Sequence, residues 1–382
     1  CDWSSDVCSS DLAMDKIYMQ RALDLSLLAA GRTSPNPLVG CVIVKDGEIV
    51  GEGYHLQAGT PHAEIHALKA AGQKAQGADV YVTLEPCSHY GRTPPCTDAL
   101  IKAGVKRVCI ALTDPNPLVN GQGLKRLQEA GITVETGILS DKAQKINEAF
   151  IKTVTQKMPF VLYKCALTLD GKTAVSSGDS KWISSPEARQ YVHHLRNTYD
   201  LIMVGSRTVI QDNPLLTCRH IEGGRNPVRL IVDATLSLPL DSKVLNPQHG
   251  LCIIAASQAA DLKKQERLKE MPNVQVWQYD TERYVPLPLL LRDIAAHGWN
   301  SILLEGGGTL AGKMLTEKLI DKIEFIIAPK IAGDGPSPIS GLKLSQMSEA
   351  VHLDNLEINE IGGNYKITGY VNNTKDTFSG SD

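Results

Sequence analysis

Two short stretches of this chain carry side chains that are suited to bind a metal ion. TPHAEIHAL contains His62 and Glu64 at the start of a helix-like pattern, and TLEPCSHYGRTPPC contains Cys87 and Cys96 on either side of a polar loop. Zinc prefers thiolate and imidazole ligands, and a catalytic zinc site has three protein ligands and an open fourth position. His62, Cys87 and Cys96 therefore predict a zinc site that leaves one position for water.

Glu64 adds a candidate proton carrier, because a carboxylate on the first helical turn can lie near the metal without binding it. Zinc lowers the pKa of a bound water towards neutrality, and the carboxylate can move that proton to a ring nitrogen and a leaving amine. H-x-E followed by P-C resembles the zinc nucleobase deaminase signature, which ends in C-x-x-C. Here eight residues, SHYGRTPP, separate Cys87 from Cys96. Their His89 and Arg92 indicate a substrate with an anionic group such as phosphate.

A purely structural interpretation of the same residues is also open. A histidine at a helix start is commonly a polar terminal residue, and cysteines are commonly small buried side chains. H-x-E alone is a weak match that occurs by chance. The combination of H-x-E, P-C and a second cysteine in a Gly/Pro loop is much more specific, and it favours the zinc site.

The elements that hold these residues are predicted by hydrophobic periodicity and turn residues. Helices and strands alternate in the first part of the chain, and Asp46-Gly47 predicts a hairpin turn. The predicted helices are 15–30, 62–71, 97–103 and 123–131, and the strands, with adjoining loop residues, are 39–44, 78–86, 105–112 and 132–139. This pattern predicts a small α/β unit around the zinc site.

The second part of the chain alternates in the same way from residue 159 onward. Predicted helices are 186–198, 261–270, 287–297 and 309–319, and predicted strands are 199–205, 228–234, 250–256, 274–277, 301–306 and 322–329, with end strands to about 371. Strands alternating with helices favour a mostly parallel sheet with helices on both faces. We therefore expect a second α/β unit.

Composition limits the class of protein. The 382 residues are 42% hydrophobic with a formal net charge of −3, so no overall basic field favours nucleic acid. No apolar run approaches the roughly 18–20 residues needed to span a bilayer. Nine scattered cysteines favour a reduced, cytoplasmic setting over a secreted one. We expect residues 1–13 to be a non-native leader before Met14, and 372–382 to be a polar tail.

Longer motifs make the chain similar to a known family. HAE with EPCSHYGRTPPC, then TDPNP, resembles the bifunctional riboflavin-biosynthesis deaminase–reductases. The second half agrees through KCALTLDGKTA, SKWIS, VGSRTVIQDNPLLTCR and LLEGGGTLAG. The resemblance covers residues 14 to 371. It implies a cytidine-deaminase-like α/β/α domain at 14–157 and a dihydrofolate-reductase-like α/β domain at 158–371.

The resemblance also implies two successive reactions on one small phosphorylated pyrimidine. The first domain would use one zinc ion to deaminate 2,5-diamino-6-ribosylamino-4(3H)-pyrimidinone 5′-phosphate. The second would reduce the ribosyl group to ribityl with NADPH. His62, Cys87 and Cys96 correspond to the zinc ligands and Glu64 to the proton carrier. The implied substrate contacts in the deaminase are Asn36, His55, His89, Arg92, Asp114 and Asn116. The family's loop often has Lys where this chain has Arg92, a substitution that keeps the charge.

The reductase residues are less marked on their own. Gly306, Gly307 and Gly308 lie between a predicted strand and helix, where backbone can approach a pyrophosphate, but a tight turn explains a Gly triplet equally well. By resemblance the substrate contacts are Ser180, Arg196, Leu216, Arg219 and Glu305. The cofactor contacts are Ala166, Trp182, Thr208, Asp212, Gly307, Gly308, Thr309, Leu310, Ala311, Gly312 and Lys313. Lys164 and Asp170 are candidates near the reacting sugar. His193 and His194 are expected to serve packing or surface roles.

Two other functions remain open at this stage. One is a zinc-dependent nucleic-acid-editing deaminase with a nucleotide-binding C-terminal domain, which the neutral composition disfavours. The other is a structural zinc protein, which has no need of the proton carrier Glu64. The resemblance further implies a homo-oligomer, and the composition favours neither a nucleic-acid nor a membrane partner.

Overall fold

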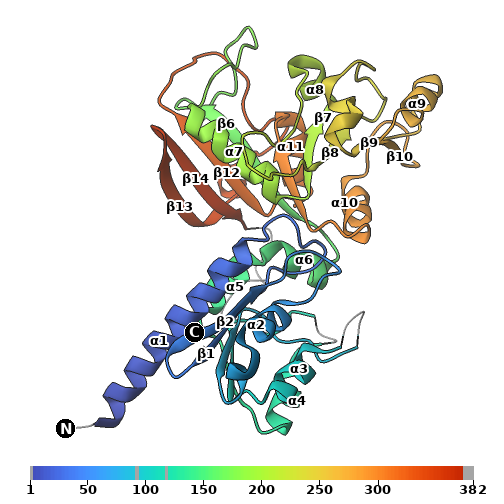
Figure 1. Ribbon diagram of the computed structural model, residues 1–382. Coiled ribbons are helices and arrows are strands. Elements are labelled where there is room, and N and C mark those ends of the chain that lie inside the picture. The colour runs from blue at the N-terminus through green and yellow to red at the C-terminus, as the bar shows by residue number, and fades with distance from the viewer. Residues whose placement is uncertain (1–2, 91–93, 117–118, 373–382) are drawn as a thin grey trace. The chain divides into compact units, whose positions relative to one another are not determined.

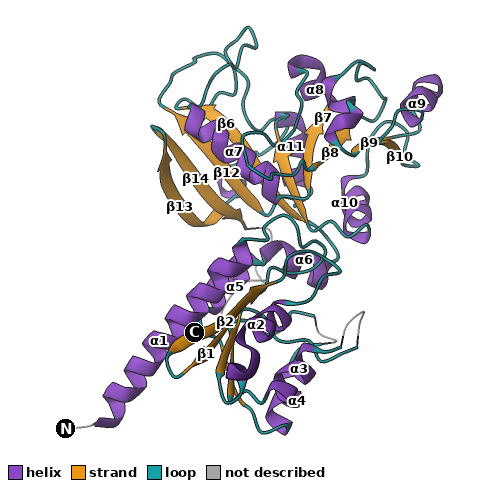
Figure 2. Cartoon of the chain, viewed as in Figure 1, coloured by secondary structure: helices purple, strands orange, loops and turns teal. Residues whose placement is uncertain are grey.

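The computed structural model describes residues 3–90, 94–116 and 119–372. It divides into two compact units, Cys1–Met158 and Pro159–Asp382 (Figure 1). Each unit is an α/β structure with a sheet of its own (Figure 2). Among the helices in the described ranges, none combines the length and apolar composition that a membrane-spanning segment needs.

The first unit is built on a five-stranded sheet in the order β2-β1-β3-β4-β5. Its strands are β1 (Gly40–Lys45), β2 (Glu48–Tyr54), β3 (Asp79–Val82), β4 (Arg107–Ile110) and β5 (Thr133–Thr136). β1 pairs antiparallel with β2 and β3, and the remaining pairs are parallel. The predicted hairpin turn is confirmed: Asp46 and Gly47 join β1 to β2 with φ of 51° and 80°, a turn that such residues favour.

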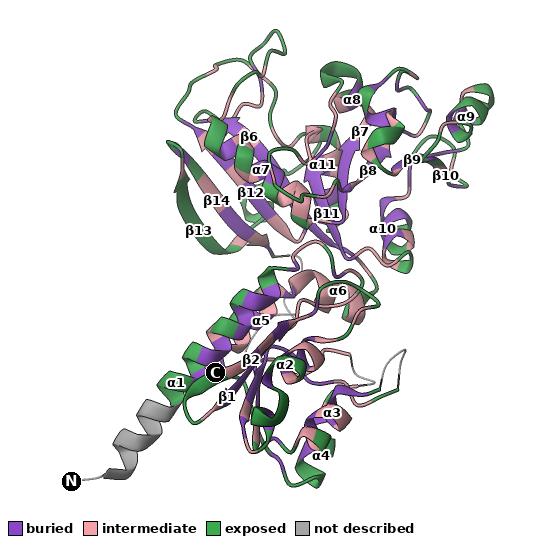
Figure 3. Ribbon diagram, viewed as in Figure 1, coloured by how far each residue is buried: buried purple, intermediate pink, exposed green. Residues whose placement is uncertain are grey.

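Helices cover both faces of this sheet. They are α1 (Trp3–Leu27), α2 (Ala63–Ala71), α3 (Cys96–Ala103), α4 (Gln122–Glu129), α5 (Ser140–Ile146) and α6 (Glu148–Gln156). Leu23 of α1 and Ala143 of α5 pack with Val42 on one face. α2, α3 and α4 pack on the other face, where Leu100 lies in one cluster with Ile43. Figure 3 shows this burial along the strands and on the sheet side of α1.

Three features of this unit differ from the expectation. α1 begins at Trp3 and so extends through residues 3–13 of the expected leader, and it ends at Leu27 rather than near residue 30. α5 and α6 were not predicted, and they are only 7 and 9 residues long, so periodicity has little room to show. The strand expected over 132–139 is confined to Thr133–Thr136.

The second unit has a nine-stranded sheet in the order β10-β9-β8-β7-β11-β6-β12-β14-β13. Its strands are β6 (Phe160–Thr168), β7 (Leu201–Gly205), β8 (Val228–Val232), β9 (Cys252–Ala256), β10 (Val274–Gln278), β11 (Ser301–Glu305), β12 (Lys322–Ala328), β13 (Leu353–Ile361) and β14 (Asn364–Val371). All pairs from β10 to β12 are parallel, and β14 and β13 add antiparallel. The predicted mostly parallel sheet is confirmed.

The helices of the second unit are α7 (Pro186–Thr198), α8 (Ser206–Asp212), α9 (Leu262–Lys269), α10 (Leu287–Ala296) and α11 (Gly308–Thr316). α7 begins cleanly because the Ser185 hydroxyl accepts the Ala188 N–H and Pro186 occupies the first helical position. α8 was not predicted. It is two turns long and ends at Asn213 with φ of 39°, so periodicity has little room to show.

Candidate active sites

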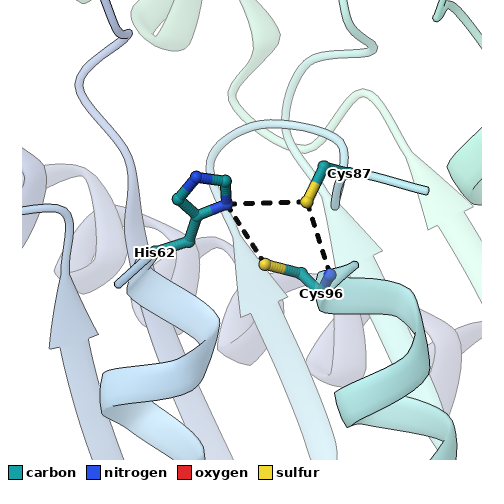
Figure 4. A group of neighbouring side chains, drawn as sticks. All are labelled: His62, Cys87 and Cys96. Atoms are coloured by element: carbon teal, nitrogen blue, oxygen red, sulfur yellow. Dashed lines mark hydrogen bonds between the residues drawn. The ribbon is translucent and has the colours of Figure 1, made fainter. Parts of the chain in front are cut away.

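His62, Cys87 and Cys96 come together at one edge of the first sheet (Figure 4). His62 is the N-cap residue of α2, Cys96 is the first residue of α3, and Cys87 lies in the segment that follows β3. The His62 Nδ1 is 3.3 Å from the Cys96 Sγ and 3.5 Å from the Cys87 Sγ. The Cys96 backbone N–H donates to the Cys87 Sγ at 3.3 Å.

The donor set fits zinc. Tetrahedral zinc with ordinary bond lengths holds a nitrogen and a sulfur ligand about 3.5 Å apart and two sulfurs about 3.8 Å apart. The three ligand atoms here all lie within 4.8 Å of one another. A hydrogen bond with the Cys96 thiol lowers the pKa of Cys87, against the effect of burial, while the same hydrogen bond raises the pKa of Cys96. The cluster therefore already favours a thiolate.

Glu64 lies beside this cluster with its carboxyl out of solvent. It is in the first turn of α2 and is 3% exposed. Burial raises its pKa to about 7, and the nearby His62 opposes that rise only in part. A carboxyl with a pKa near neutrality can both take and give a proton at physiological pH.

Asn36 and His55 form a fixed pair against His62. The His55 Nε2 is 3.0 Å from the Asn36 Nδ2, and its Nδ1 is 3.2 Å from the Pro61 carbonyl oxygen. The carbonyl can only accept, so Nδ1 carries the proton and Nε2 accepts from the amide. Burial lowers the pKa of His55, which keeps the ring neutral. The His55 ring meets the His62 ring edge-on, with centroids 5.5 Å apart.

Asp114 and Asn116 lie in the segment between β4 and α4. The Asn116 N–H donates to the Asp114 Oδ1 at 2.8 Å, and burial raises the pKa of Asp114. His89 is exposed and close enough to influence that pKa. Arg92 lies outside the described residues.

Sequence reasoning missed Glu85. Its buried carboxylate accepts backbone N–H groups from the segment that carries Asp114 and from the start of α4. The available signal was an acidic residue directly before Pro86-Cys87 at the end of a buried strand.

In the second unit several candidate residues lie on parallel strands or directly after them: Lys164 is in β6, and Glu305 ends β11. The carboxyl ends of parallel strands meet at one edge of a sheet, where α/β proteins commonly bind ligands. Lys164 pairs in register with Glu305 on one side and Glu324 on the other, so the three side chains share one face. α7 packs on this face, since its Ala188 clusters with Ile326, two residues from Glu324.

α7 contributes a buried arginine to this face. Arg196 donates from Nε and Nη2 to both Glu305 carboxylate oxygens at 2.8 Å, and from Nη1 to the Thr217 carbonyl at 3.1 Å. Burial opposes ionisation of Glu305, but the charge and hydrogen bonds of Arg196, together with the Lys164 charge, lower the pKa of that carboxyl. Arg219 is exposed and donates from Nη1 to the Thr217 Oγ1 at 2.8 Å. Arg196 is thus committed largely to Glu305, whereas Arg219 faces solvent.

The glycines after β11 serve two different purposes. Gly306 and Gly307 have φ of 78° and 80°, so they form the turn into α11 and lie near Thr208. Gly308 and Gly312 allow α11 to approach another segment, because a Cβ would lie 2.8 Å from the Ser337 oxygen and 2.0 Å from the Ser340 oxygen, respectively. The N-cap residue of α11, Gly307, provides no side-chain hydrogen bond to the first backbone N–H groups of the helix.

The other predicted reductase residues are spread over several elements. Ala166 lies in β6, Ser180 in the segment between β6 and α7, Asp212 at the end of α8, and Thr309 and Leu310 in the first turn of α11. The Leu216 and Ala311 side chains are buried. Trp182 is 62% exposed beneath the Arg189 guanidinium. Lys313 lies over the Tyr284 ring and 3.7 Å from Glu317.

Asp170 is held by the backbone rather than poised for proton transfer. Its carboxylate accepts the Thr168 hydroxyl at 2.6 Å and the Gly333 N–H at 2.8 Å. The Thr168 hydrogen bond, with those from 332–333, lowers the pKa of Asp170 to about 2. A carboxylate this acidic is poorly suited to donate a proton near neutral pH.

Comparisons with known proteins agree with both units. Residues 13–112 match the family described as cytidine and deoxycytidylate deaminase zinc-binding region, and residues 159–367 match the RibD C-terminal domain. The first unit therefore has the fold of a zinc-dependent deaminase, and the second has that of a dihydrofolate-reductase-like reductase.

Whole-chain relatives identify the combination. The riboflavin biosynthesis protein RibD of Bacillus amyloliquefaciens is 42% identical over 95% of this chain and 98% of its own length, and that of Escherichia coli is 42% identical over 91% and 97%. The structure of Acinetobacter baumannii RibD has a TM-score of 0.84 at 39% identity, covering 94% of this chain and 99% of that one. A Thermotoga maritima structure described as a diaminohydroxyphosphoribosylaminopyrimidine deaminase/5-amino-6-(5-phosphoribosylamino)uracil reductase has a TM-score of 0.83 at 37% identity.

The chain belongs to the RibD family of riboflavin biosynthesis proteins, and it is a bifunctional deaminase and reductase. The deaminase fold is a zinc-binding one, and the reductase fold implies a nicotinamide cofactor. The nucleic-acid-editing alternative is not favoured.

Proposed function

We propose that the chain catalyses two consecutive steps on one intermediate. Residues 14–157 hydrolyse the exocyclic amine of 2,5-diamino-6-ribosylamino-4(3H)-pyrimidinone 5′-phosphate, and residues 158–371 reduce the ribosyl group of the product to ribityl with NADPH. The observation that carries the first step is the His62, Cys87 and Cys96 cluster beside the buried carboxyl of Glu64. A purely structural metal site would have no use for that buried carboxyl.

In the deamination, His62, Cys87 and Cys96 would hold zinc, which would supply Lewis-acid activation of a water molecule. Glu64 takes a proton from the attacking water, transfers it to the pyrimidine ring nitrogen, and then carries the second proton to the departing amine. Water adds at the ring carbon, the carbon–nitrogen bond breaks, and ammonia leaves. The near-neutral pKa of Glu64 suits both directions of proton transfer.

The substrate pocket of the deaminase comprises Asn36, His55, His89, Arg92, Asp114 and Asn116. The neutral His55 ring and the Asn36 amide offer a fixed polar edge next to His62. His89 and Arg92 belong to the loop between the two cysteine ligands, where cationic groups can bind the ribosyl phosphate.

In the reduction, bound NADPH would supply the hydride for C1′ of the ribosylamino group, while the bond from C1′ to the ring oxygen breaks and that oxygen gains a proton. Arg219 binds the substrate phosphate, with Ser180, Arg196, Leu216 and Glu305 lining the site around Lys164. Arg196 acts mainly by fixing Glu305. The NADPH contacts are Ala166, Trp182, Thr208, Asp212, Gly307, Gly308, Thr309, Leu310, Ala311, Gly312 and Lys313.

We also propose that the chain acts as a homo-oligomer in the cytoplasm. β13 is an edge strand that is exposed along most of its length, and its Leu356 and Ile358 are 59% and 67% exposed. Natural proteins rarely leave such an apolar edge uncovered. No disulfide joins Cys41, Cys87, Cys96, Cys109, Cys165, Cys218 and Cys252, which suits a reducing compartment.

An ultraviolet assay tests the two reactions and their order. Purified protein receives the diaminopyrimidine ribosyl phosphate with and without NADPH, before and after treatment with a chelator. We expect zinc-dependent ammonia release without NADPH, and NADPH oxidation only after deamination. Ammonia release without NADPH oxidation would remove the second step, and no ammonia release from zinc-loaded protein would remove the first.

A further inference from the structure

Glu85, which lies between β3 and Cys87, accepts an unusual number of hydrogen bonds from the backbone of a distant segment. Its Oε2 accepts the N–H groups of Asp114 and Gly121, each at 3.0 Å. Its Oε1 accepts the N–H of Gly123 at 2.8 Å and that of Leu124 at 3.4 Å. One carboxylate, 5% exposed, therefore collects four backbone donors from 114–124.

These donors include the start of α4, a helix that has no side-chain cap of its own. Its N-cap residue is Gly121, and the first helical N–H groups lack partners within the helix. Glu85 supplies the missing acceptor from 38 residues earlier in the chain. A negative charge at a helix N-terminus is also favoured by the helix dipole.

The contact is too close to admit a side chain at Gly123. A Cβ there would lie 2.2 Å from the Pro86 carbonyl oxygen and 3.1 Å from the Glu85 side chain. The Glu85 N–H also donates to the Leu112 carbonyl at 2.9 Å, which ties it to the residues after β4. Glu85, Pro86 and Gly123 thus form a clamp between the zinc-ligand segment and the segment that follows β4.

We propose that Glu85 is a positioning residue for deamination: it sets Asp114 and Asn116 at a fixed distance from the zinc ligand Cys87. This inference rests on the proposed function, because it assumes that Asp114 contacts substrate. Glu85 itself does not touch substrate, since its oxygens are occupied by backbone N–H groups.

Glu85→Gln tests this proposal in the full-length zinc-loaded enzyme. The amide has nearly the same shape, but its NH₂ group would face two N–H donors and lose both hydrogen bonds. We expect the KM for deamination to rise about ten-fold or more, kcat to change less than about three-fold, and one zinc per chain to remain. Reductase activity on the deaminated substrate should be unchanged. Glu129→Gln, at the exposed end of α4, is the matched control and should alter neither constant.

Asp114→Asn and a double-mutant cycle distinguish the substrate-binding role of Asp114 from the positioning role of Glu85. If Asp114→Asn leaves KM unchanged, the pocket role of Asp114 fails. If Asp114→Asn raises KM and Glu85→Gln does not, the role of Glu85 is overturned. A double variant no worse than the poorer single variant supports action through Asp114, whereas additive effects or loss of zinc from Glu85→Gln would overturn it. If Glu85→Gln does not fold, Glu85→Asp provides the same test with a smaller KM rise.

Discussion

At the scale of single residues, the first unit combines a soft ligand set with a buried acid. His62, Cys87 and Cys96 are close enough to share one cation, and Glu64 has a carboxyl whose pKa burial raises to about 7. The ligands and the acid have separate tasks. Substitutions can therefore remove proton transfer without removing the metal site.

Glu64→Gln should abolish deamination and spare the rest of the enzyme. The amide keeps the volume of the side chain but cannot carry a proton, so kcat for ammonia release should fall about 10²- to 10⁴-fold. Zinc content, measured by metal analysis, and NADPH oxidation with deaminated substrate should match the parent protein. Unchanged ammonia release would contradict the catalytic assignment of Glu64.

His193, for which the sequence predicts a packing or surface role, accepts a hydrogen bond from the backbone of Arg219. It is 8% exposed, and its Nδ1 accepts the Arg219 N–H at 3.2 Å, which requires a ring without a proton on that nitrogen. Burial, with the charges of Arg196 and Arg219, lowers its pKa to about 4. The ring is therefore neutral in the folded protein at neutral pH.

This lowered pKa predicts that the reductase unit loses stability as the pH falls. Between about pH 6.5 and 4 the unfolded chain binds a proton at His193 that the folded chain does not, so stability falls as pH falls through this window. His193→Asn, which accepts but does not titrate, should flatten this part of the dependence of the unfolding temperature on pH. The exposed neighbour His194→Asn is the control, and equal slopes in parent and His193→Asn would contradict the prediction.

At the scale of elements, glycines both form the turn before α11 and allow the helix to pack closely against the 337–340 segment. Gly312 lies on the side of the helix that meets the 337–340 segment, where a Cβ would be 2.0 Å from the Ser340 oxygen. The backbone oxygen cannot move without displacing the whole segment. α11 also presents the stretch that we assign to NADPH.

Gly312→Ala should therefore weaken both stability and cofactor binding. Forcing a methyl group into this contact costs about 1–3 kcal/mol, and the shifted helix should raise the Kd for NADPH. Thermal unfolding with and without NADPH measures both effects. Gly205→Ala is a matched control, because its Cβ would lie 4.0 Å from Leu310 in ordinary contact. Equal unfolding temperatures for the two variants would show that α11 tolerates displacement.

At the scale of the whole molecule, the nine-stranded sheet of the second unit ends in the exposed edge strand β13. β13 presents exposed Leu356 and Ile358, and in the neighbouring strand β14 Tyr365 is 53% exposed. Ile358 pairs with Ile367, and Glu360 with Tyr365, so these side chains share one face of the hairpin. A second copy of the chain is the partner that we expect to cover it.

Ile358→Lys should disrupt association without unfolding the chain, because the side chain is already 67% exposed. The mass in solution, measured by light scattering after size-exclusion chromatography, should fall relative to the parent protein. Leu262→Lys is the matched control, since Leu262 is also 67% exposed but lies on α9. A parent protein that is monomeric at all concentrations would contradict the proposed homo-oligomer.

Local pattern in the sequence was enough to predict the α/β class, the alternation of elements and the residues now found together at the zinc cluster. His62 and Glu64 are separated by one residue, and each cysteine adjoins a proline in a short loop, so near neighbours carry the signal. The Asp46-Gly47 turn was predictable for the same reason, because turn conformation depends on the residues within the turn.

Only the tertiary structure decided which buried polar groups pair. Glu85 meets Gly123 from 38 residues away and Arg196 meets Glu305 from 109 residues away, and no local spacing encodes either contact. The same holds for Gly312, whose need for glycine comes from a segment that folds back onto α11. Such pairings arise because a buried charge or N–H group needs a hydrogen-bond partner in the folded core. The tertiary fold determines which residue lies close enough to be that partner.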